Sequence, residues 1–360
     1  MARDRDTVVY TPHYPFRRSS YRVADVTVHC LSNRRERGAR RLLVWRELAR
    51  CIAADHARKP FALIHSFWAT ESGFLGTMMA RRLGIPSIVS IGGGELARQP
   101  HENYGAQLHA VQRMFVRRSF HHASIITAGS RWVAAKVPEE YRKKLVVMPL
   151  GVDTDMFHPG ELRKGLRLLA SASLIALKDY PTILRAVAGA RRHLPGITLA
   201  IAGDGVERAR LERLTDELHL RDAVTFLGHV PHDTMPALYH SADLFLHGSL
   251  YESQCMVVLE ALATGLPVAA SDVGVAAELP ESVVKRFRPG DAAGLASEII
   301  NSLVSCAHAR AAHAHGPELV HNYYSVERAS AMAAGLYRRL RPDVAKFPGA
   351  MPQPVQEELQ

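Results

Sequence analysis

The sequence has few cysteines, few aromatic residues and no long apolar run. Its four cysteines, Cys30, Cys51, Cys255 and Cys306, lie far apart without metal-ligand spacing, so we expect reduced thiols in a cytoplasmic protein. No apolar stretch is long enough to span a bilayer, and the basic amino terminus is not followed by the apolar core of a signal peptide. These absences argue against an integral membrane protein and against a disulfide-stapled secreted domain.

The net charge of +10 is spread unevenly along the chain. Residues 1–150 carry 25 Lys and Arg against 11 Asp and Glu, a net charge of +14, whereas the remainder is mildly acidic. This asymmetry predicts an anionic partner for the first half, either an anionic membrane surface or a polyanionic acceptor. A solvated arginine-rich surface without a partner is an equally good interpretation. Nucleic acid is not expected, because the basic residues are not interleaved with aromatics in a recognisable module.

Length and pattern predict two α/β domains. At 360 residues, with 47% hydrophobic and 22% charged residues, the chain is typical of a soluble globular protein with two cores. Strands alternate with helices throughout, which predicts doubly wound parallel sheets. Residues 1–24 show no convincing buried strand, and residues 341–360 are expected to be disordered. The expected strands lie at 26–31, 61–65, 88–91, 124–128, 145–148, 166–172, 197–205, 223–230, 242–247 and 268–271.

Residues 249–274 organise the second half of the chain. An apolar strand just upstream is followed by a loop, a helix beginning near Met256 and a second short strand at 268–271. Strand, loop, helix and strand in this order are typical of one turn of a parallel α/β sheet.

Two glutamates, Glu252 and Glu260, bracket the junction of this loop and helix, with seven residues between them. The free backbone N–H groups of Gln254, Cys255 and Met256 are expected to form the positive end of the helix, where a diphosphate can bind. Carboxylates accept hydrogen bonds from sugar hydroxyls. The pattern therefore indicates a sugar-bearing diphosphate as ligand, although an isolated pair of this kind is as well explained by an ordinary helix with solvated glutamates.

This stretch resembles the signature of the retaining GT-B glycosyltransferases of the large family numbered four, also called glycosyl transferases group 1. That signature is a glutamate, seven residues, a second glutamate, then Gly-x-Pro-Val and a glycine-containing turn. The chain departs from it at Gln254 and Cys255, where an aromatic residue and glycine are usual. The matching positions are Glu252, Glu260, Gly265, Pro267, Val268 and Gly274.

The resemblance implies GT-B architecture, in which two Rossmann-like doubly wound domains face a cleft. It also implies that Glu252 contacts the transferred sugar and that Glu260 holds the nucleotide ribose. Lys178 matches a cation that clamps the donor diphosphate, whereas Ser173 stands where arginine is usual. The resemblance thus names Glu252 and Lys178 as catalytic, and as donor-binding Glu260, Gln254, Cys255, Met256, Ser173, Gly203, Gly205 and Val230.

The acceptor side is expected in the first domain, where His65 and Gly92 end neighbouring strands and edge one crevice. Relatives usually carry a histidine near the reacting sugar at the position of Gly92, so we count Gly92 as a catalytic position and expect the leaving phosphate to take the acceptor proton. Gly93, Gly94 and Glu95 follow as acceptor-side residues, and glycine N–H groups there suit an anion. A glycine-rich turn is equally expected after any strand, and a lone histidine such as His65 is more often a satisfied core residue.

Residues 149–157 resemble the interdomain linker of the same family. We therefore expect an acceptor-side domain at 1–150, a donor-binding domain at 151–324, a helix crossing back to the first domain at 325–340 and a tail at 341–360. Relatives commonly begin with an apolar strand and a Gly-Gly loop, which residues 1–24 do not match. The sequence thus predicts either a first domain without its first strand or a misplaced start.

The resemblance implies a metal-independent glycosyltransferase without a cofactor. We expect its donor to be a nucleotide-diphosphate sugar, its acceptor a glycan, a lipid-linked sugar or a cell-envelope or exopolysaccharide precursor, and the anomeric configuration to be retained. We expect it in the cytoplasm, with the inner face of the plasma membrane as a peripheral site. The alternative is a catalytically degenerate GT-B scaffold that binds nucleotide or a partner glycosyltransferase, which Gly92 and Ser173 favour. A dinucleotide-dependent oxidoreductase is not expected, because no Gly-x-Gly-x-x-Gly follows a first strand.

Overall fold

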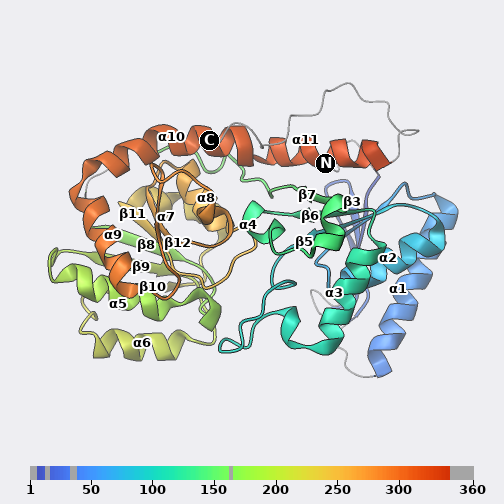
Figure 1. Ribbon diagram of the computed structural model, residues 1–360, viewed down its shortest axis with the longest axis horizontal. Coiled ribbons are helices and arrows are strands. Elements are labelled where there is room, and N and C mark those ends of the chain that lie inside the picture. The colour runs from blue at the N-terminus through green and yellow to red at the C-terminus, as the bar shows by residue number, and fades with distance from the viewer. Residues whose placement is uncertain (1–5, 13–16, 33–38, 162–164, 341–360) are drawn as a thin grey trace.

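The computed structural model describes residues 6–12, 17–32, 39–161 and 165–340. Figure 1 shows two α/β lobes side by side, with the last two helices running along one edge from the C-terminal lobe to the N-terminal lobe. The predicted architecture of two doubly wound α/β domains is confirmed. The expected tail at 341–360 lies outside the described residues.

The C-terminal lobe is built on a six-stranded parallel sheet in the order β10-β9-β8-β11-β12-β13. Its central strands are apolar and buried on both faces because helices cover both sides. The strands are β8 (Arg167–Ser171), β9 (Thr198–Ala202), β10 (Val224–Gly228), β11 (Leu244–His247), β12 (Val268–Ser271) and β13 (Val284–Phe287). The helices are α5 (Tyr180–Arg191), α6 (Arg208–Glu217), α7 (Met235–Ser241), α8 (Met256–Ala263), α9 (Ala292–Val304) and α10 (Cys306–Tyr324), with short turns η4 (Ala176–Lys178), η5 (His232–Thr234) and η6 (Gly274–Ala277).

The direction of this sheet's growth reverses between β8 and β11. From β8 the chain adds β9 and β10 on one side, then returns to add β11, β12 and β13 on the other. The loops after β8 and β11 therefore leave in opposite directions and open a crevice at their carboxyl ends, where ligands of such sheets bind. Lys178 follows β8 and Glu252 follows β11, so the fold brings both to this crevice.

The N-terminal lobe contains a four-stranded parallel sheet in the order β4-β5-β6-β7. These strands are β4 (Ile64–Phe67), β5 (Ser87–Ile91), β6 (Ile125–Ala128) and β7 (Leu145–Val147). The accompanying helices are α1 (Ala39–Arg58), α2 (Glu71–Leu83), α3 (Ala110–His122) and α4 (Arg131–Ala134), with turns η2 (Ala106–Leu108) and η3 (Glu139–Lys144). Within the described ranges, no helix is both long enough and apolar enough to span a bilayer.

The first thirty residues contain more structure than the sequence predicts. Strands β1 (Val8–Thr11), β2 (Ser19–Val23) and β3 (Val26–Cys30) form a separate sheet with β3 in the centre, parallel to β1 and antiparallel to β2. The sequence predicts no convincing buried strand in residues 1–24, and the two strands that form there are only partly buried or exposed. No residue of β1 or β2 is fully buried, so neither strand shows the apolar run by which a buried strand is predicted.

The chain passes between the lobes twice, and the two crossings are hydrogen-bonded to each other. The N–H of Val152 donates to the carbonyl of Tyr324 (2.7 Å), and the N–H of Val326 donates to the carbonyl of Val152 (3.0 Å). A Cβ on Gly151 would lie 2.4 Å from the Cα of Val326, so the close approach requires glycine there.

After this crossing, α11 (Val326–Leu340) packs on the N-terminal sheet. Its buried residues Ala333 and Leu336 belong to one apolar cluster with Ile88, Ile125 and Met148. The last helix is therefore part of the N-terminal lobe in space, although it is the end of the described chain.

We predict that Gly151→Ala lowers the melting temperature by several degrees, because the methyl group forces the paired crossings apart at a cost of about 1–3 kcal/mol. Gly189→Ala in α5 is the matched control. There the new methyl would meet Ala296 Cβ at an ordinary 3.4 Å, and alanine favours a helix over glycine. Thermal unfolding followed by circular dichroism checks both variants; equal melting temperatures for the two would contradict the prediction.

Candidate active site

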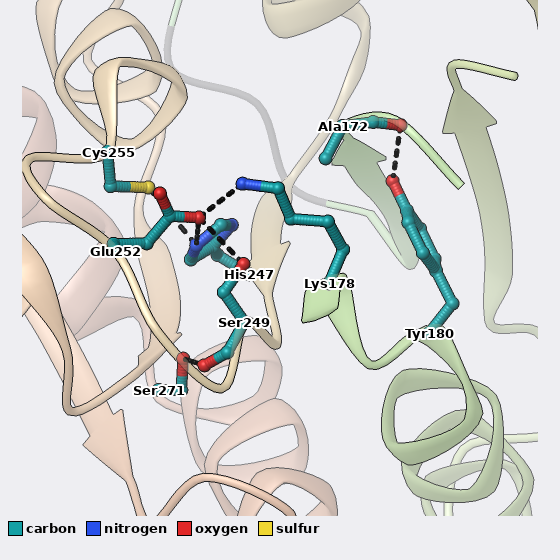
Figure 2. A network of polar contacts seen from close by, with 8 residues as sticks. All are labelled: Ala172, Lys178, Tyr180, His247, Ser249, Glu252, Cys255 and Ser271. Carbon is teal, nitrogen blue, oxygen red and sulfur yellow. Dashed lines mark hydrogen bonds and ion pairs between the residues drawn. The ribbon is translucent and has the colours of Figure 1, made fainter. Parts of the chain in front are cut away.

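Side chains from three segments of the C-terminal lobe converge at the crevice between β8 and β11. Figure 2 shows Lys178 from η4, His247 from the end of β11, and Ser249 and Glu252 from the following loop, pointing toward one another. Lys178 and Glu252 are two predicted catalytic residues, and the structure brings them into contact.

The carboxylate of Glu252 lies at the centre of this cluster. Its Oε1 accepts a hydrogen bond from Ser249 Oγ (2.7 Å) and lies 3.2 Å from His247 Nε2. The same oxygen is paired with the ammonium of Lys178. The side chain of Glu252 is only 12% exposed, so a carboxylate with three polar neighbours is held almost out of water.

Burial by itself raises the pKa of Glu252, but the hydrogen bond from His247 and the charge of Lys178 outweigh it and lower the pKa to about 2. The carboxylate is therefore ionised at neutral pH. An ionised, nearly buried carboxylate accepts strong hydrogen bonds from hydroxyl groups that enter the crevice.

Cys255 connects to the same cluster through His247. Its Sγ lies 3.1 Å from His247 Nε2, and its backbone is left-handed, with φ 81°. This conformation favours glycine, the usual residue at this position of the resembling family. Burial raises the pKa of the Cys255 thiol well above its usual range, so the group is protonated.

His247, Glu252 and Cys255 also offer nitrogen, oxygen and sulfur atoms that lie within 4.8 Å of one another, a spacing suited to a metal ion. Lys178 already places a positive charge on Glu252 and so competes electrostatically with a cation. The expected metal independence stays a prediction.

The second glutamate, Glu260, lies on α8 and is also nearly buried. Tyr239 donates a hydrogen bond to its Oε2 (2.9 Å), and His232 Nε2 lies 3.3 Å from its Oε1. Burial and the neighbouring Glu260 raise the pKa of Tyr239, so the hydroxyl remains a donor and fixes the carboxylate. Met256 begins α8 one turn earlier, where the first N–H groups have no intrahelical partner.

The amide of Gln254 is used between the lobes. Its Oε1 accepts from the N–H of Leu150 (2.7 Å), and its Nε2 donates to the carbonyl of Leu150 (2.8 Å). The side chain of Gln254 therefore joins the lobes, and its expected donor contact, through the backbone N–H, stays a prediction. Ser130 Oγ adds a further bond across the interface, to the carbonyl of Ser253 (2.6 Å).

Gly203 and Gly205 are glycine because another segment passes close to them. A Cβ on Gly203 would lie 2.0 Å from the carbonyl oxygen of Ala172, and one on Gly205 would lie 2.4 Å from that of Leu174. Their N–H groups donate within the lobe, to the carbonyl of Gly228 and to the Asp204 side chain. These contacts explain why both positions are glycine without any contact to a nucleotide.

Two other predicted donor residues lie at the same edge of the sheet. Ser173 is exposed in the loop after β8, and Val230 is half-buried in the loop after β10. Their donor contacts stay predictions.

On the facing lobe, Glu95 closes the glycine-rich loop upon itself. Its Oε1 accepts from the N–H groups of Gly92 (3.0 Å) and Ala69 (3.1 Å), and its Oε2 accepts from the N–H of Gly93 (2.7 Å). Glu95 is buried. This corrects the expectation that glycine N–H groups of this loop are free for an anion, because those of Gly92 and Gly93 are occupied by an internal carboxylate.

His65 is likewise satisfied inside the protein. Its Nε2 lies 2.7 Å from Ser90 Oγ and its Nδ1 lies 2.8 Å from the hydroxyl of Tyr337 on α11. Burial lowers the pKa of His65 to about 4, so the ring is neutral. The geometry supports the core-histidine interpretation and not an acceptor contact.

Several residues of the crevice escaped the sequence analysis because their roles depend on neighbours far apart in the chain. His247 and Ser249 had one usable signal, since His247 ends the predicted strand and Ser249 lies between it and Glu252. The residues missed are His247, Ser249, His232 and Tyr239.

Two family models together match residues 1–311. The model described as "Glycosyl transferases group 1" matches residues 152–311, and "Glycosyl transferase 4-like domain" matches residues 1–151. The chain is also 29% identical over 229 residues to the GDP-mannose-dependent alpha-(1-6)-phosphatidylinositol monomannoside mannosyltransferase of Mycobacterium tuberculosis, covering 58% of this chain and 60% of the relative. It spans between about a third and three fifths of the length of the first curated relatives it matches.

Solved structures share the fold at lower identity. The sucrose-phosphate synthase of Thermosynechococcus elongatus superposes with a TM-score of 0.76 at 20% identity, over 94% of this chain and 90% of that one. HepE of Anabaena, in complex with UDP-glucose, superposes with a TM-score of 0.72 at 18% identity, over 87% and 86% of the two chains. These similarities establish the architecture.

The depressed pKa of Glu252 predicts an acid-sensitive contribution to stability. The carboxyl titrates near 4.5 when unperturbed and near 2 in the folded protein, so the contribution is complete above about pH 4.5 and is lost as the pH falls toward about 2. The difference corresponds to on the order of 3 kcal/mol.

Between pH 5 and 3, the melting temperature of the wild-type protein should therefore fall more steeply than that of Glu252→Gln. Glu281→Gln, which removes an exposed partner of Arg286, is the control and should follow the wild type. Parallel curves for wild type and Glu252→Gln would contradict the prediction.

Proposed function

The chain belongs to the glycosyl transferases of group 1, and from that premise we propose that it transfers a sugar from a nucleotide-diphosphate sugar to an acceptor with retention of anomeric configuration. The observation that carries the proposal is the ionised, nearly buried Glu252 paired with Lys178 at the point where the sheet reverses. Glu260 lies on α8, one turn beyond its first residue, Met256. The positive charge of Lys178 and two carboxylates that can accept hydrogen bonds from hydroxyl groups thus lie where a nucleotide sugar is expected to bind.

The donor would be held by three groups. Lys178 exchanges Glu252 for the diphosphate, whose oxygens also receive the first N–H groups of α8. Glu260, oriented by Tyr239, accepts from the ribose hydroxyls. Glu252 accepts from hydroxyls of the transferred sugar. UDP-glucose in the HepE structure and the GDP-mannose dependence of the mycobacterial relative support a nucleotide sugar as donor.

The reaction breaks the bond between the anomeric carbon and the diphosphate oxygen and forms one to an acceptor oxygen. Negative charge develops on the leaving diphosphate, and Lys178 and the α8 N-terminus stabilise it there. Gly92 offers no side chain as a base, so the acceptor proton goes to the departing phosphate oxygen on the same face of the sugar. In the proposed mechanism, attack on that face retains the anomeric configuration and needs no metal ion.

We predict micromolar binding of one nucleoside diphosphate among UDP, GDP and ADP, weakened at least tenfold by Glu260→Ala, as measured by calorimetry. Tyr239→Phe should weaken it about two- to fivefold, because the lost hydrogen bond leaves the Glu260 carboxylate less well oriented. Glu281→Ala, which removes an exposed partner of Arg286, is the control. A folded wild-type protein that binds none of the three would favour the alternative of a degenerate scaffold.

The acceptor we propose is a lipid-linked or envelope glycan reached at the inner face of the plasma membrane. The relative's name specifies a phosphatidylinositol-linked substrate, and helix α1 offers a matching surface. Leu42 and Leu43 are 55% and 64% exposed, and Arg46 and Arg50 lie exposed on the same face. Apolar side chains among arginines suit an anionic membrane surface.

Vesicle sedimentation tests this surface. We predict that the protein binds vesicles containing phosphatidylglycerol more tightly than vesicles of phosphatidylcholine alone, and that binding weakens as salt rises. Exchange of Leu42 and Leu43 for serine should reduce binding about tenfold, whereas Val206→Ser, at an exposed position of the C-terminal lobe, should leave it unchanged. Equal binding to both kinds of vesicle would contradict an electrostatic membrane contact.

A further inference from the structure

Two aromatic side chains lie against the glycine-rich loop of the N-terminal lobe. A Cβ on Gly92 would lie 2.9 Å from Nε1 of Trp68, and a Cβ on Gly94 would lie 2.8 Å from the ring of Tyr104. These separations are shorter than real Cβ contacts, so the two rings occupy the space of the side chains that these glycines lack.

Trp68 reaches this position through a strained backbone. It follows β4 with φ 66°, in the left-handed region that a bulky residue seldom adopts. Its N–H donates to the carbonyl of Ser90 (2.9 Å), and its own carbonyl accepts from the N–H of Gly73 (2.9 Å), which holds it there. Such strain costs about 1–3 kcal/mol and gathers at functional sites.

The indole of Trp68 is poorly used by the fold itself. The residue is 56% exposed, and no residue in the described part of the chain accepts a hydrogen bond from its Nε1–H. Of the two other tryptophans of this lobe, Trp45 and Trp132, the first donates its indole N–H to Glu71. The Trp68 ring is exposed, its N–H has no acceptor among the described residues, and its backbone is strained. These features are typical of a ligand-binding residue and not of a core residue.

The loop beneath this ring adjoins the donor site. The carbonyl of Ile91, just before Gly92, lies 3.4 Å from Ser253 Oγ, and Ser253 follows Glu252. Trp68 therefore lies against a loop of the N-terminal lobe that contacts the segment carrying Glu252.

We propose that Trp68 binds the acceptor sugar. The indole occupies the space that a side chain at position 92 would otherwise fill. Its exposed face packs against the pyranose ring, and its Nε1–H donates to one of the sugar hydroxyls. The indole N–H only donates, so Trp68 positions the acceptor and takes no proton from it. This inference rests on the proposed transfer reaction and names the recognition element of its second substrate.

Acceptor binding is testable by saturation-transfer NMR with methyl α-mannoside, methyl α-glucoside and myo-inositol, in the presence of the nucleoside diphosphate that the protein binds. We expect at least one of the three to bind wild-type protein, Trp68→Ala to weaken its affinity at least tenfold, and Trp68→Phe to weaken it about threefold. Nucleotide affinity should change less than twofold in both variants. Trp45→Phe removes a different indole of the same lobe and is the control.

A second pair of variants tests the shared space. Gly92→His alone should weaken acceptor binding at least tenfold, because its Cβ collides with the indole. Combined with Trp68→Ala it should do no further harm, since the indole is gone. Additive losses in the double variant would overturn the proposal that the two positions compete for one place.

The outcomes separate this inference from the reaction on which it rests. A wild-type protein that binds no nucleoside diphosphate refutes the proposed function. A protein that binds its nucleotide but none of the three probes, or whose Trp68→Ala variant keeps wild-type probe affinity, overturns the role of Trp68 alone. Equal losses of nucleotide and probe affinity in Trp68→Ala would show a structural effect and would also overturn it.

Discussion

The site depends on keeping one buried carboxylate charged. A carboxylate taken out of water without partners costs several kcal/mol or becomes protonated. Glu252 remains ionised because Lys178, His247 and Ser249 surround it, and these partners come from the loop after β8, the end of β11 and the loop after β11. Such segments converge only where the sheet order reverses. Glu252 is therefore kept ionised by partners that only this strand order brings to its side chain.

The loop that carries this charge also joins the lobes. Gln254 binds both backbone groups of Leu150, and Ser253 accepts from Ser130 across the same interface. Glu278 adds a contact by accepting from the N–H of Trp132 (2.6 Å). A rotation of one lobe against the other must break these hydrogen bonds. Ser253 and Gln254 lie within two residues of Glu252, and Glu278 lies four residues after Gly274. The position of the acceptor lobe and the conformation of the donor loop are thus coupled through one short segment.

The sequence was informative where structure depends on local pattern and poor where it depends on distant partners. Buried parallel strands are apolar runs, so five of the six strands of the C-terminal lobe could be predicted, as could the placement of Glu252 after β11. The edge strand β13, which carries Lys285 and Arg286, was not predicted. The half-exposed β1 and β2 lack such runs. The partners of His65 and Gln254 lie 272 and 104 residues away, and no local pattern specifies them. The hydrogen bonds of Glu95 to Gly92 and Gly93 are local in sequence. The sequence does not show, however, whether this carboxylate binds its own loop or a ligand.

Two departures from the family pattern, Gly92 and Cys255, each have a neighbouring residue that accompanies the change. This bears on whether the scaffold has lost its activity. Gly92 lacks the usual histidine, and the Trp68 indole lies where that side chain would begin. Cys255 replaces a glycine at φ 81°, and its sulfur contacts His247, which also lies against Glu252. Since Glu252 is ionised, His247 Nε2 must carry the proton it donates, and the protonated thiol accepts beside it. Gly92 and Cys255 thus each meet a second residue that uses the free space or the polar group, whereas Ser173, where arginine is usual, is exposed. The crevice keeps its charged centre.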